Sequence, residues 1–558
     1  MVAYGTTISV PMVSRANYVF DGWDAPPAAT MPDNDLTYTA QWTPAEASVT
    51  VEGEDPTYYA TVAEAFTAAH GKTDPTVKIL KEEVTIASEI TISASMTIDL
   101  NGKTISSAVT TAATGVFKIN ASGKTVTITD SGTGGKISHI ANCAGYVYGI
   151  NLFAGSLNVE GGYIYAENTY ATAGTAYRAC GIMYADKQTN PASLTVSDGT
   201  IEAKRASTYV YGISIYTGNC GLTMTGGTVK ASGGNGLVRG IYTQGTAELT
   251  DVTVTATAAL TGTANCYAVF SDKDGKYTIN SGTYTATSTS TGTNAYAISL
   301  TKASSATTGG SAIVKGGRFS GKSKELNISN GTITLQGGYY VHNTDLAVNC
   351  ATNYHVLPNA DANYPYKVAE AYNVTFNNYD GTELQSGLVE KGQNPVYTEA
   401  TPTKSQTDKY SYTFSGWDPA VSAVTGAATY TAQFNSTIRT YAITWKNRNG
   451  STLREDQVAY DKWPEYGSVP TCDPTESQVF EFRAWTPEIT VVTGAKTYTA
   501  DYTASPRQYP VIWKNYDGSP LKTIWHNYGW EDIPAADTYD GATPTRPIEN
   551  GKTYTFKG

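Results

Sequence analysis

Short runs of alternating apolar and polar residues recur through the middle of the chain. In each run Leu, Val, Ile, Met or an aromatic residue occupies every second position, and a bend of Gly or another small residue interrupts the alternation. The runs lie at 157–164, 194–201, 222–229, 277–284, 312–319 and 333–340. Because successive side chains of a strand point to opposite faces, these runs predict short, half-buried β-strands.

A second motif, in which Gly or Ala precedes a β-branched residue, lies between these runs and recurs at steps of 28 to 34 residues. Its small residues are Gly115, Gly149, Gly181, Gly212, Gly240, Ala268 and Ala297. Three short strands per unit fit a solenoid whose coils stack on one another, whereas a β-propeller, the alternative, needs four-stranded blades of about 40 residues. We therefore predict an all-β fold built on a right-handed parallel β-helix at 86–368.

The open end of such a solenoid is an exposed sheet edge that needs a cover. Thr61 followed by Glu64 forms the capping box of a helix through Ala69, with Val62 and Phe66 on one face. We assign 45–85 to an N-terminal cap that contains this helix.

The residues on either side repeat with a different period. A Trp or Phe strand ends in Asp-Gly or Asn-Gly, the residues of a tight hairpin turn, at 376–381, 445–450 and 513–518. Trp417 recurs as Trp485, 68 residues later, and the same motif precedes Trp23. These repeats predict small β modules. Their ranges are 1–44, 369–436, 437–505 and 506–558, and because the first and last are incomplete we expect a segment of a longer tandem protein.

Composition divides the chain in the same way. All nine Trp lie outside 43–416, and of 23 Pro only Pro191 lies between Pro75 and Pro358. Pro cannot donate to a strand ladder, so its scarcity fits strands paired on both sides. An aromatic content of 11% argues against disorder, and a net charge of −11 without a basic patch argues against nucleic acid as a partner. No apolar run approaches the length of a membrane span.

The flanking motifs carry a resemblance to a known family. Tyr-Val-Phe-Asp-Gly-Trp-Asp at 18–24, with Thr-Tyr-Thr-Ala-Gln-Trp at 37–42, resembles the Listeria–Bacteroides repeat, the internalin-type B repeat of bacterial surface proteins. The residues at 59–65, 78–80 and 100–105 resemble the entry to pectate-lyase-like β-helices of such proteins. Ala484 departs from the pattern, because the other copies have Gly before Trp.

The resemblance implies β-grasp-like modules beside the β-helix and a place at the extracellular bacterial cell surface. It implies an adhesin or stalk, with glycans, host or bacterial surface proteins, and neighbouring repeats of the same longer chain as partners. It supplies no catalytic residue and no cofactor, so we expect a non-enzymatic protein.

The main alternative is a carbohydrate-active enzyme, a polysaccharide lyase or glycoside hydrolase. Asn343-Thr344-Asp345 matches one acidic motif of polygalacturonase-like enzymes, but the other motifs of that family are missing. Asp272 and Asp274 are the nearest candidates for a calcium site, but a plain loop turn explains them better. Five other coil carboxylates could converge, without a spacing that selects a pair: Asp186, Asp198, Glu202, Glu248 and Asp251.

The sequence gives little support for a metal site or for reactive cysteines. The five His are scattered, which disfavours a zinc site, and the six Cys contain no Cys-x-x-Cys motif. We expect buried free thiols, with a Cys143–Cys180 disulfide between coils as the alternative.

One tyrosine position of the solenoid repeats from coil to coil. Tyr148, Tyr211, Tyr267 and Tyr296 occupy the site before the recurring small residue and would form a column along one face. The column either stabilises the solenoid by stacking or provides a platform for glycan or protein ligands. For the chain as a whole, a third possible function beside an adhesin and an enzyme is a spacer that binds nothing.

Overall fold

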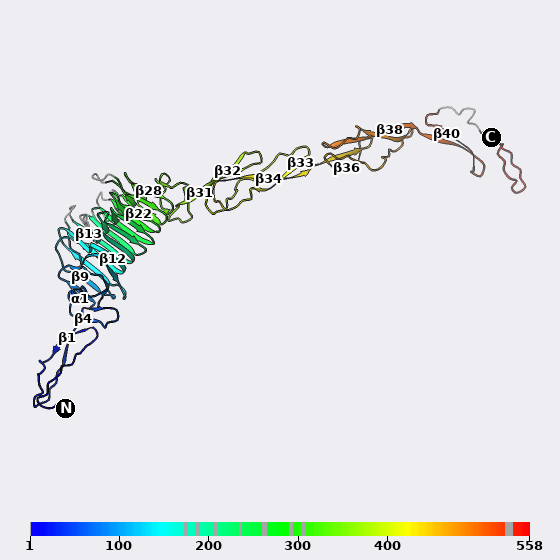
Figure 1. Ribbon diagram of the computed structural model, residues 1–558. Coiled ribbons are helices and arrows are strands. Elements are labelled where there is room, and N and C mark those ends of the chain that lie inside the picture. The colour runs from blue at the N-terminus through cyan, green and yellow to red at the C-terminus, as the bar shows by residue number, and fades with distance from the viewer. Residues whose placement is uncertain are drawn as a thin grey trace. The chain divides into compact units, whose positions relative to one another are not determined.

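The computed structural model describes residues 2–171, 177–184, 190–205, 209–233, 236–258, 265–289, 294–302, 308–530 and 539–558. Within these residues the structure is almost all β, with large mixed sheets, which confirms that part of the prediction (Figure 1). It divides into two compact units. Unit 1 contains Met1–Tyr372 and Glu390–Gly392, and unit 2 contains Asn373–Val389 and Gln393–Gly558.

Most strands of unit 1 belong to three parallel ladders, which the chain visits in the order A, B, C and then again from A. Ladder A contains the first parts of β10 (Phe117–Thr129) and β12 (Tyr146–Asn168), with β7 (Ile90–Ile92), β13 (Arg178–Tyr184), β15 (Tyr209–Ile215), β18 (Val238–Thr243), β21 (Cys266–Ser271), β24 (Ala295–Leu300) and β27 (Leu326–Ile328). Each pass therefore lays three short strands on those of the pass before.

Ladder B contains the next parts of β10 and β12, the first part of β14 (Ala192–Arg205), β5 (Thr76–Ile79), β8 (Met96–Asp99), β16 (Cys220–Met224), β19 (Thr246–Leu249), β22 (Lys276–Ile279), β25 (Ser311–Val314) and β28 (Thr332–Leu335). Ladder C contains the ends of β12 and β14, with β6 (Glu83–Ile86), β9 (Thr104–Ser107), β11 (Lys136–Ala141), β17 (Thr228–Gly233), β20 (Val252–Ala258), β23 (Gly282–Ser288), β26 (Arg318–Ser320) and β29 (Tyr339–Tyr340).

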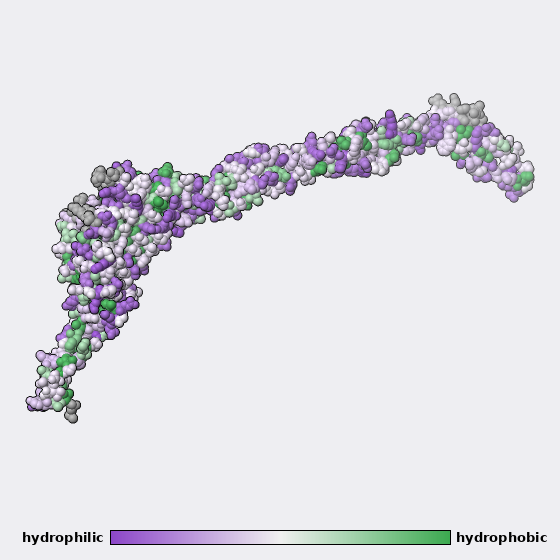
Figure 2. Space-filling view, viewed as in Figure 1, coloured by the Kyte–Doolittle hydropathy of each residue, from purple (hydrophilic) through white to green (hydrophobic). Residues whose placement is uncertain are grey.

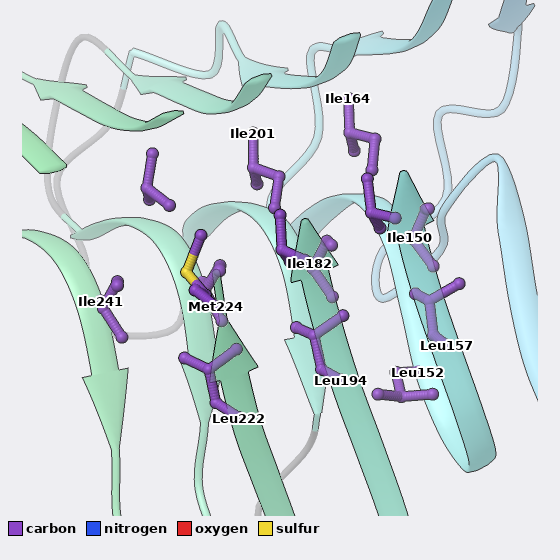
Figure 3. Packing of buried hydrophobic residues seen from close by; sticks show 14 of the residues in the cluster. Ile150, Leu152, Leu157, Ile164, Ile182, Leu194, Ile201, Leu222, Met224 and Ile241 are labelled. Carbon is purple, nitrogen blue, oxygen red and sulfur yellow. The ribbon is translucent and has the colours of Figure 1, made fainter. Parts of the chain in front are cut away.

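The core lies between the ladders and consists of columns of like residues. In ladder A, Ile150 pairs with Ile182; in ladder B, Leu157 pairs with Leu194; and in ladder C, Ile164 pairs with Ile201. All these side chains are buried, and Figure 3 shows them pointing toward one another from the three strands of each pass. Burying one such side chain contributes about 1.5–3 kcal/mol, so the columns hold successive passes together.

The first passes are covered by β3 (Ala47–Thr50), β4 (Thr57–Tyr59) and α1 (Val62–Ala69). β3 pairs antiparallel with β4 and β5, and the apolar face of α1 packs on them, with Phe66 5.3 Å from the ring of Phe117. The predicted capping box is confirmed, because the hydroxyl of Thr61 accepts from the Glu64 amide and the Glu64 carboxylate from the Thr61 amide.

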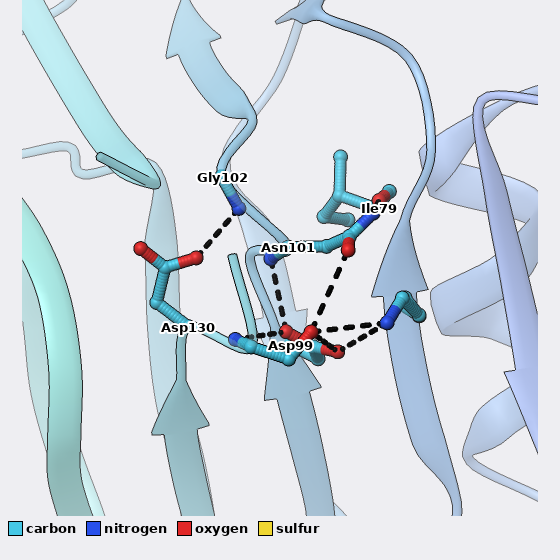
Figure 4. Close-up of polar contacts among 7 residues, drawn as sticks. Ile79, Asp99, Asn101, Gly102 and Asp130 are labelled. Carbon is cyan, nitrogen blue, oxygen red and sulfur yellow. Dashed lines mark hydrogen bonds and ion pairs between the residues drawn. The ribbon is translucent and has the colours of Figure 1, made fainter. Parts of the chain in front are cut away.

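A polar network holds the bend that follows β8 (Figure 4). The buried carboxylate of Asp99 accepts from the amides of Asn101 and Ser131, both at 2.9 Å, and lies 3.1 Å from the ammonium of Lys78. Asp130 of the next pass accepts from the Gly102 amide at 2.6 Å. Each carboxylate thus replaces ladder hydrogen bonds that a turning backbone cannot make.

At the other end of unit 1 the pairing becomes antiparallel. β29 pairs with β31 (Tyr366–Asn377), which also pairs with β30 (Tyr354–Pro358), and η1 (Ala347–Asn349) precedes them. Unit 1 also contains β1 (Tyr18–Trp23) and β2 (Ala40–Pro44), an antiparallel pair near the N-terminus. The last pass therefore ends against a hairpin.

Unit 2 contains small sheets with a shared pattern. Its strands are β32 (Glu383–Glu390), β33 (Tyr410–Asp418), β34 (Ala428–Ile438), β35 (Thr440–Lys446), β36 (Thr452–Ala459), β37 (Gln478–Thr486), β38 (Lys496–Pro506), β39 (Gln508–Lys514) and β40 (Pro520–Asn527). The sheet β36-β35-β38-β37 is centred on the fully buried Trp445, whose ring lies 4.6 Å from that of Trp485. Ala484 keeps the bulge that Gly416 makes in β33, so the substitution leaves the register unchanged.

Candidate binding surface

The tyrosines that the sequence singles out share one row of ladder A. Parallel register pairs Tyr148 with Cys180, Cys180 with Tyr211, and Tyr211 with Arg239. Arg239 in turn pairs with Tyr267, which pairs with Tyr296. The structure thus brings all four tyrosines into one column, with a thiol and a guanidinium between them.

These tyrosines are mostly covered by other parts of the chain. Tyr148, Tyr211 and Tyr267 are buried, and Tyr296 is partly buried, its ring stacked on that of Tyr267 at 6.0 Å. Their cluster is separate from the main core and includes Met183, Tyr242 and Phe270. The rings therefore pack mainly within this cluster, and their role as a ligand platform remains a prediction.

Two arginines lie within this cluster. The Arg239 guanidinium carbon is 3.7 Å from the ring centre of Phe270 and 5.4 Å from that of Tyr211. The Arg178 guanidinium carbon lies 5.8 Å from the Tyr211 ring centre and 4.9 Å from that of Tyr216. Both guanidinium groups therefore lie near the Tyr211 ring. Burial disfavours the charged forms, but the neighbouring phenol oxygens raise the pKa of both arginines overall.

The coil carboxylates that the sequence proposes for catalysis or calcium binding have local partners. Asp272 accepts from the Tyr242 hydroxyl at 2.9 Å, and Asp251 from Ser281. Asp345 forms an ion pair with Lys324 at 3.0 Å. The remaining contacts are Asp198 with the Gly199 amide, Glu202 with the Tyr163 hydroxyl, Glu248 with the Asn280 amide group and Asp274 with the Thr308 hydroxyl. Asp186 lies outside the described residues.

All six cysteines are free thiols, and Cys143, Cys180, Cys220 and Cys266 are buried. Burial raises the pKa of Cys180, Cys220 and Cys266 to about 12. The prediction of buried free thiols is confirmed for these four residues, whereas Cys350 and Cys472 are only partly buried, and the Cys143–Cys180 disulfide is not formed.

The last passes of ladder C contain an interior stack of three aromatic rings. Tyr284, Phe319 and Tyr340 are fully buried, with neighbouring ring centres 5.2 Å apart. Gly317 and Gly338 bend over this stack with φ of 109° and 105°, and a Cβ on Gly338 would lie 2.9 Å from the Tyr340 hydroxyl. Only glycine fits there, because the backbone is left-handed and a ring lies directly beneath.

A row of outward-facing side chains crosses the same passes. Register pairs Thr253 with Thr283, Thr283 with Arg318, and Arg318 with Tyr339. Tyr339 then pairs with Lys367 of β31. Because the glycine bends carry no side chains, the row borders open hollows along this edge.

Tyr339 lies where two of these hollows meet. One, of about 380 Å³, extends from Asp251 along the bends to Arg318, and the other, also about 380 Å³, extends toward Lys367 and Glu370. The Tyr339 side chain is 40% exposed, and the Arg318 guanidinium carbon lies 5.7 Å from its ring centre. We call this surface the Tyr339 groove.

Paired charges form the walls of the groove. Arg318 lies 3.4 Å from Asp361, Lys391 bonds Glu370 at 2.8 Å, and Lys367 pairs with Glu390. The hydrogen bond from Lys391 lowers the pKa of Glu370, which stays ionised. In Figure 2 the surface over the coils is mainly hydrophilic to neutral, with apolar residues scattered singly.

Sequence reasoning missed the Tyr339 groove. Tyr339 lies in the run 333–340, where alternation predicts an outward position, but nothing in the sequence showed that β31 would bring Lys367 beside it. The one available signal was the pair Tyr339-Tyr340, which places an aromatic residue on both faces of one strand.

No helix among the described residues is long and apolar enough to cross a membrane. No family model matches the chain, and no curated protein matches it significantly. One similar solved structure is that of "Streptococcal High Identity Repeats in Tandem (SHIRT) domains 3-4 from cell surface protein". It is 16% identical, covers 24% of this chain and 99% of its own, and has a TM-score of 0.14. The likeness is too slight to assign a fold or a function.

Proposed function

We propose that the chain is a non-enzymatic segment of an extracellular bacterial surface protein. In this proposal a right-handed parallel β-helix lies between β-grasp-like modules of the Listeria–Bacteroides type, with the boundaries given above. The three parallel ladders support the β-helix, and the 68-residue spacing of Trp417 and Trp485 supports the repeats. The protein acts as an adhesin or a stalk that presents a binding surface.

The observation that carries the binding role is the exposed Tyr339 ring, between Arg318 and Lys367 at the junction of two hollows. An aromatic face offers apolar contact to the C–H face of a sugar ring, and charged side chains around it bond sugar hydroxyls. The Thr253–Thr283 row adds hydroxyl groups across consecutive passes. We therefore favour a glycan over a protein as the ligand.

The test is a glycan array probed with the whole chain, followed by titration of any hit. We expect Tyr339→Ala to weaken binding at least about tenfold, because a hot-spot aromatic typically contributes 2 kcal/mol or more. Tyr379→Ala is the matched control, since Tyr379 is 42% exposed but belongs to unit 2. Equal affinity of the Tyr339 variant and the wild type would refute the groove as the site.

The same preparation distinguishes the other functions. Release of reducing ends or unsaturated products from a polysaccharide would show a carbohydrate-active enzyme and overturn the proposal. An array without hits, together with no binding to surface proteins, would leave the spacer role.

A further inference from the structure

The aromatic cluster of ladder A contains an excess of buried hydrogen-bond donors. The Nε groups of Arg178 and Arg239 and the hydroxyl of Ser214 are buried, and none of them has a hydrogen-bond partner among the described residues. Arg239 is 93% buried and Ser214 completely buried. A buried donor that lacks an acceptor costs about 1–3 kcal/mol, so three such groups on one face of one ladder require an explanation.

The same cluster contains an excess of positive charge. Neither Arg178 nor Arg239 forms an ion pair with a carboxylate of the described residues. Asp272 influences Arg239 from a greater distance, but its carboxylate is held by the hydroxyl of Tyr242 and the amide of Gln244. The carboxylate that acts on Arg239 is therefore already bonded to other groups, and a buried charge without a partner is costly.

The aromatic rings account for only part of this cost. Arg178 donates to the Tyr216 hydroxyl, and Arg239 donates to the Tyr211 hydroxyl at 3.3 Å. Phenol oxygens and ring faces are weaker partners for a guanidinium than an oxyanion, which accepts two parallel N–H bonds. The site thus has the donors that an oxyanion requires, and the part of the chain that the structure describes supplies no oxyanion to accept from them.

We propose that Arg178 and Arg239, with Ser214 and the Tyr211 ring between them, form a binding site for an oxyanion. Arg178 is only half-buried, as are Tyr146, Tyr209 and Tyr216 around it, so this end of the site reaches solvent. The ligand chemistry is a carboxylate or sulfate group, either as a free ion or as the acidic substituent of a sugar. The site is independent of the Tyr339 groove.

The test measures thermal unfolding of the whole chain at constant ionic strength, with sodium chloride replaced stepwise by sodium sulfate or sodium glucuronate, and glucose as the uncharged probe. We expect a saturable rise in Tm with at least one of the two anions and none with glucose, because a ligand that binds only the native state stabilises it. The more effective anion identifies the source of the oxyanion. A Tm in sulfate and in glucuronate that is no higher than the Tm in sodium chloride alone would overturn the proposal.

Variants at the two arginines show whether these residues cause the anion-dependent rise in Tm. Arg178→Met and Arg239→Met remove the charge and keep most of the apolar stem, and each should weaken anion binding at least about tenfold. Arg448→Met is the matched control, because Arg448 also lies over an aromatic ring, that of Phe480, but belongs to unit 2. If Arg239→Met does not fold, Arg178→Met at the half-buried end decides the question. An unchanged response in Arg178→Met would refute the site.

Discussion

Removing the central ring of the aromatic stack in ladder C tests the link between the core and the Tyr339 groove. Phe319 is fully buried, with the rings of Tyr284 and Tyr340 on either side at 5.2 Å. Phe→Ala changes in cores cost about 3–5 kcal/mol in total, which includes the contacts that the lost ring made. We therefore expect Phe319→Ala to lower the free energy of local unfolding by about 4 kcal/mol.

The loss should be confined to the last passes. In a stacked array each repeat contacts only its neighbours, so damage to β26 reaches β23 and β29 first. The amide of Tyr339 donates to the Gly317 carbonyl at 2.8 Å and reports directly on this region. If it exchanges by local opening, a loss of about 4 kcal/mol accelerates its hydrogen exchange roughly a thousandfold.

The assay is native-state hydrogen exchange with peptide resolution, combined with glycan titration. Amides of β14 should exchange as in the wild type, and Phe556→Ala, at a residue 50% exposed, should change stability by less than about 0.5 kcal/mol. Acceleration of the Tyr339 amide by less than tenfold would refute the reasoning. So would full retention of groove binding by a variant whose last passes have opened.

Two further predictions concern buried polar groups. Burial acts to raise the pKa of Asp99, but hydrogen bonds from Ser131 and the nearby Lys78 lower it below its usual value. The stability it contributes is complete above about pH 4 and is lost as pH falls through the native pKa, so Asp99→Asn should lower Tm at pH 7 more than at pH 3; equal losses would contradict this. Native Cys180 and Cys266 should resist iodoacetamide at pH 8 and react in guanidinium, whereas native labelling detected by mass spectrometry would contradict their burial.

The sequence located the repeated elements because each is a local pattern. Alternation at 157–164 and 194–201 gave strands whose Leu157 and Leu194 pair in the structure. The row of Tyr148, Tyr211, Tyr267 and Tyr296 followed from spacing alone, because parallel stacking places equivalent residues of successive passes side by side.

Exposure could not be predicted in the same way. An outward position on a ladder is solvent-exposed only if nothing else packs on it, and that depends on contacts between distant segments. Tyr211 faces outward yet is buried, whereas Tyr339 faces outward and is 40% exposed. The tyrosine column therefore identified a real structural row without identifying the accessible surface.

Both candidate sites lie where the repeat departs from its own rule. Most columns repeat one kind of side chain, and packing alone explains that repetition. Arg239 interrupts a column of tyrosines at the cost of a buried charge, and Arg318, Tyr339 and Lys367 replace a row of threonines where the pairing becomes antiparallel. Residues that break a local pattern without improving the packing are best explained by a ligand, because stability alone would favour the residue that the pattern predicts.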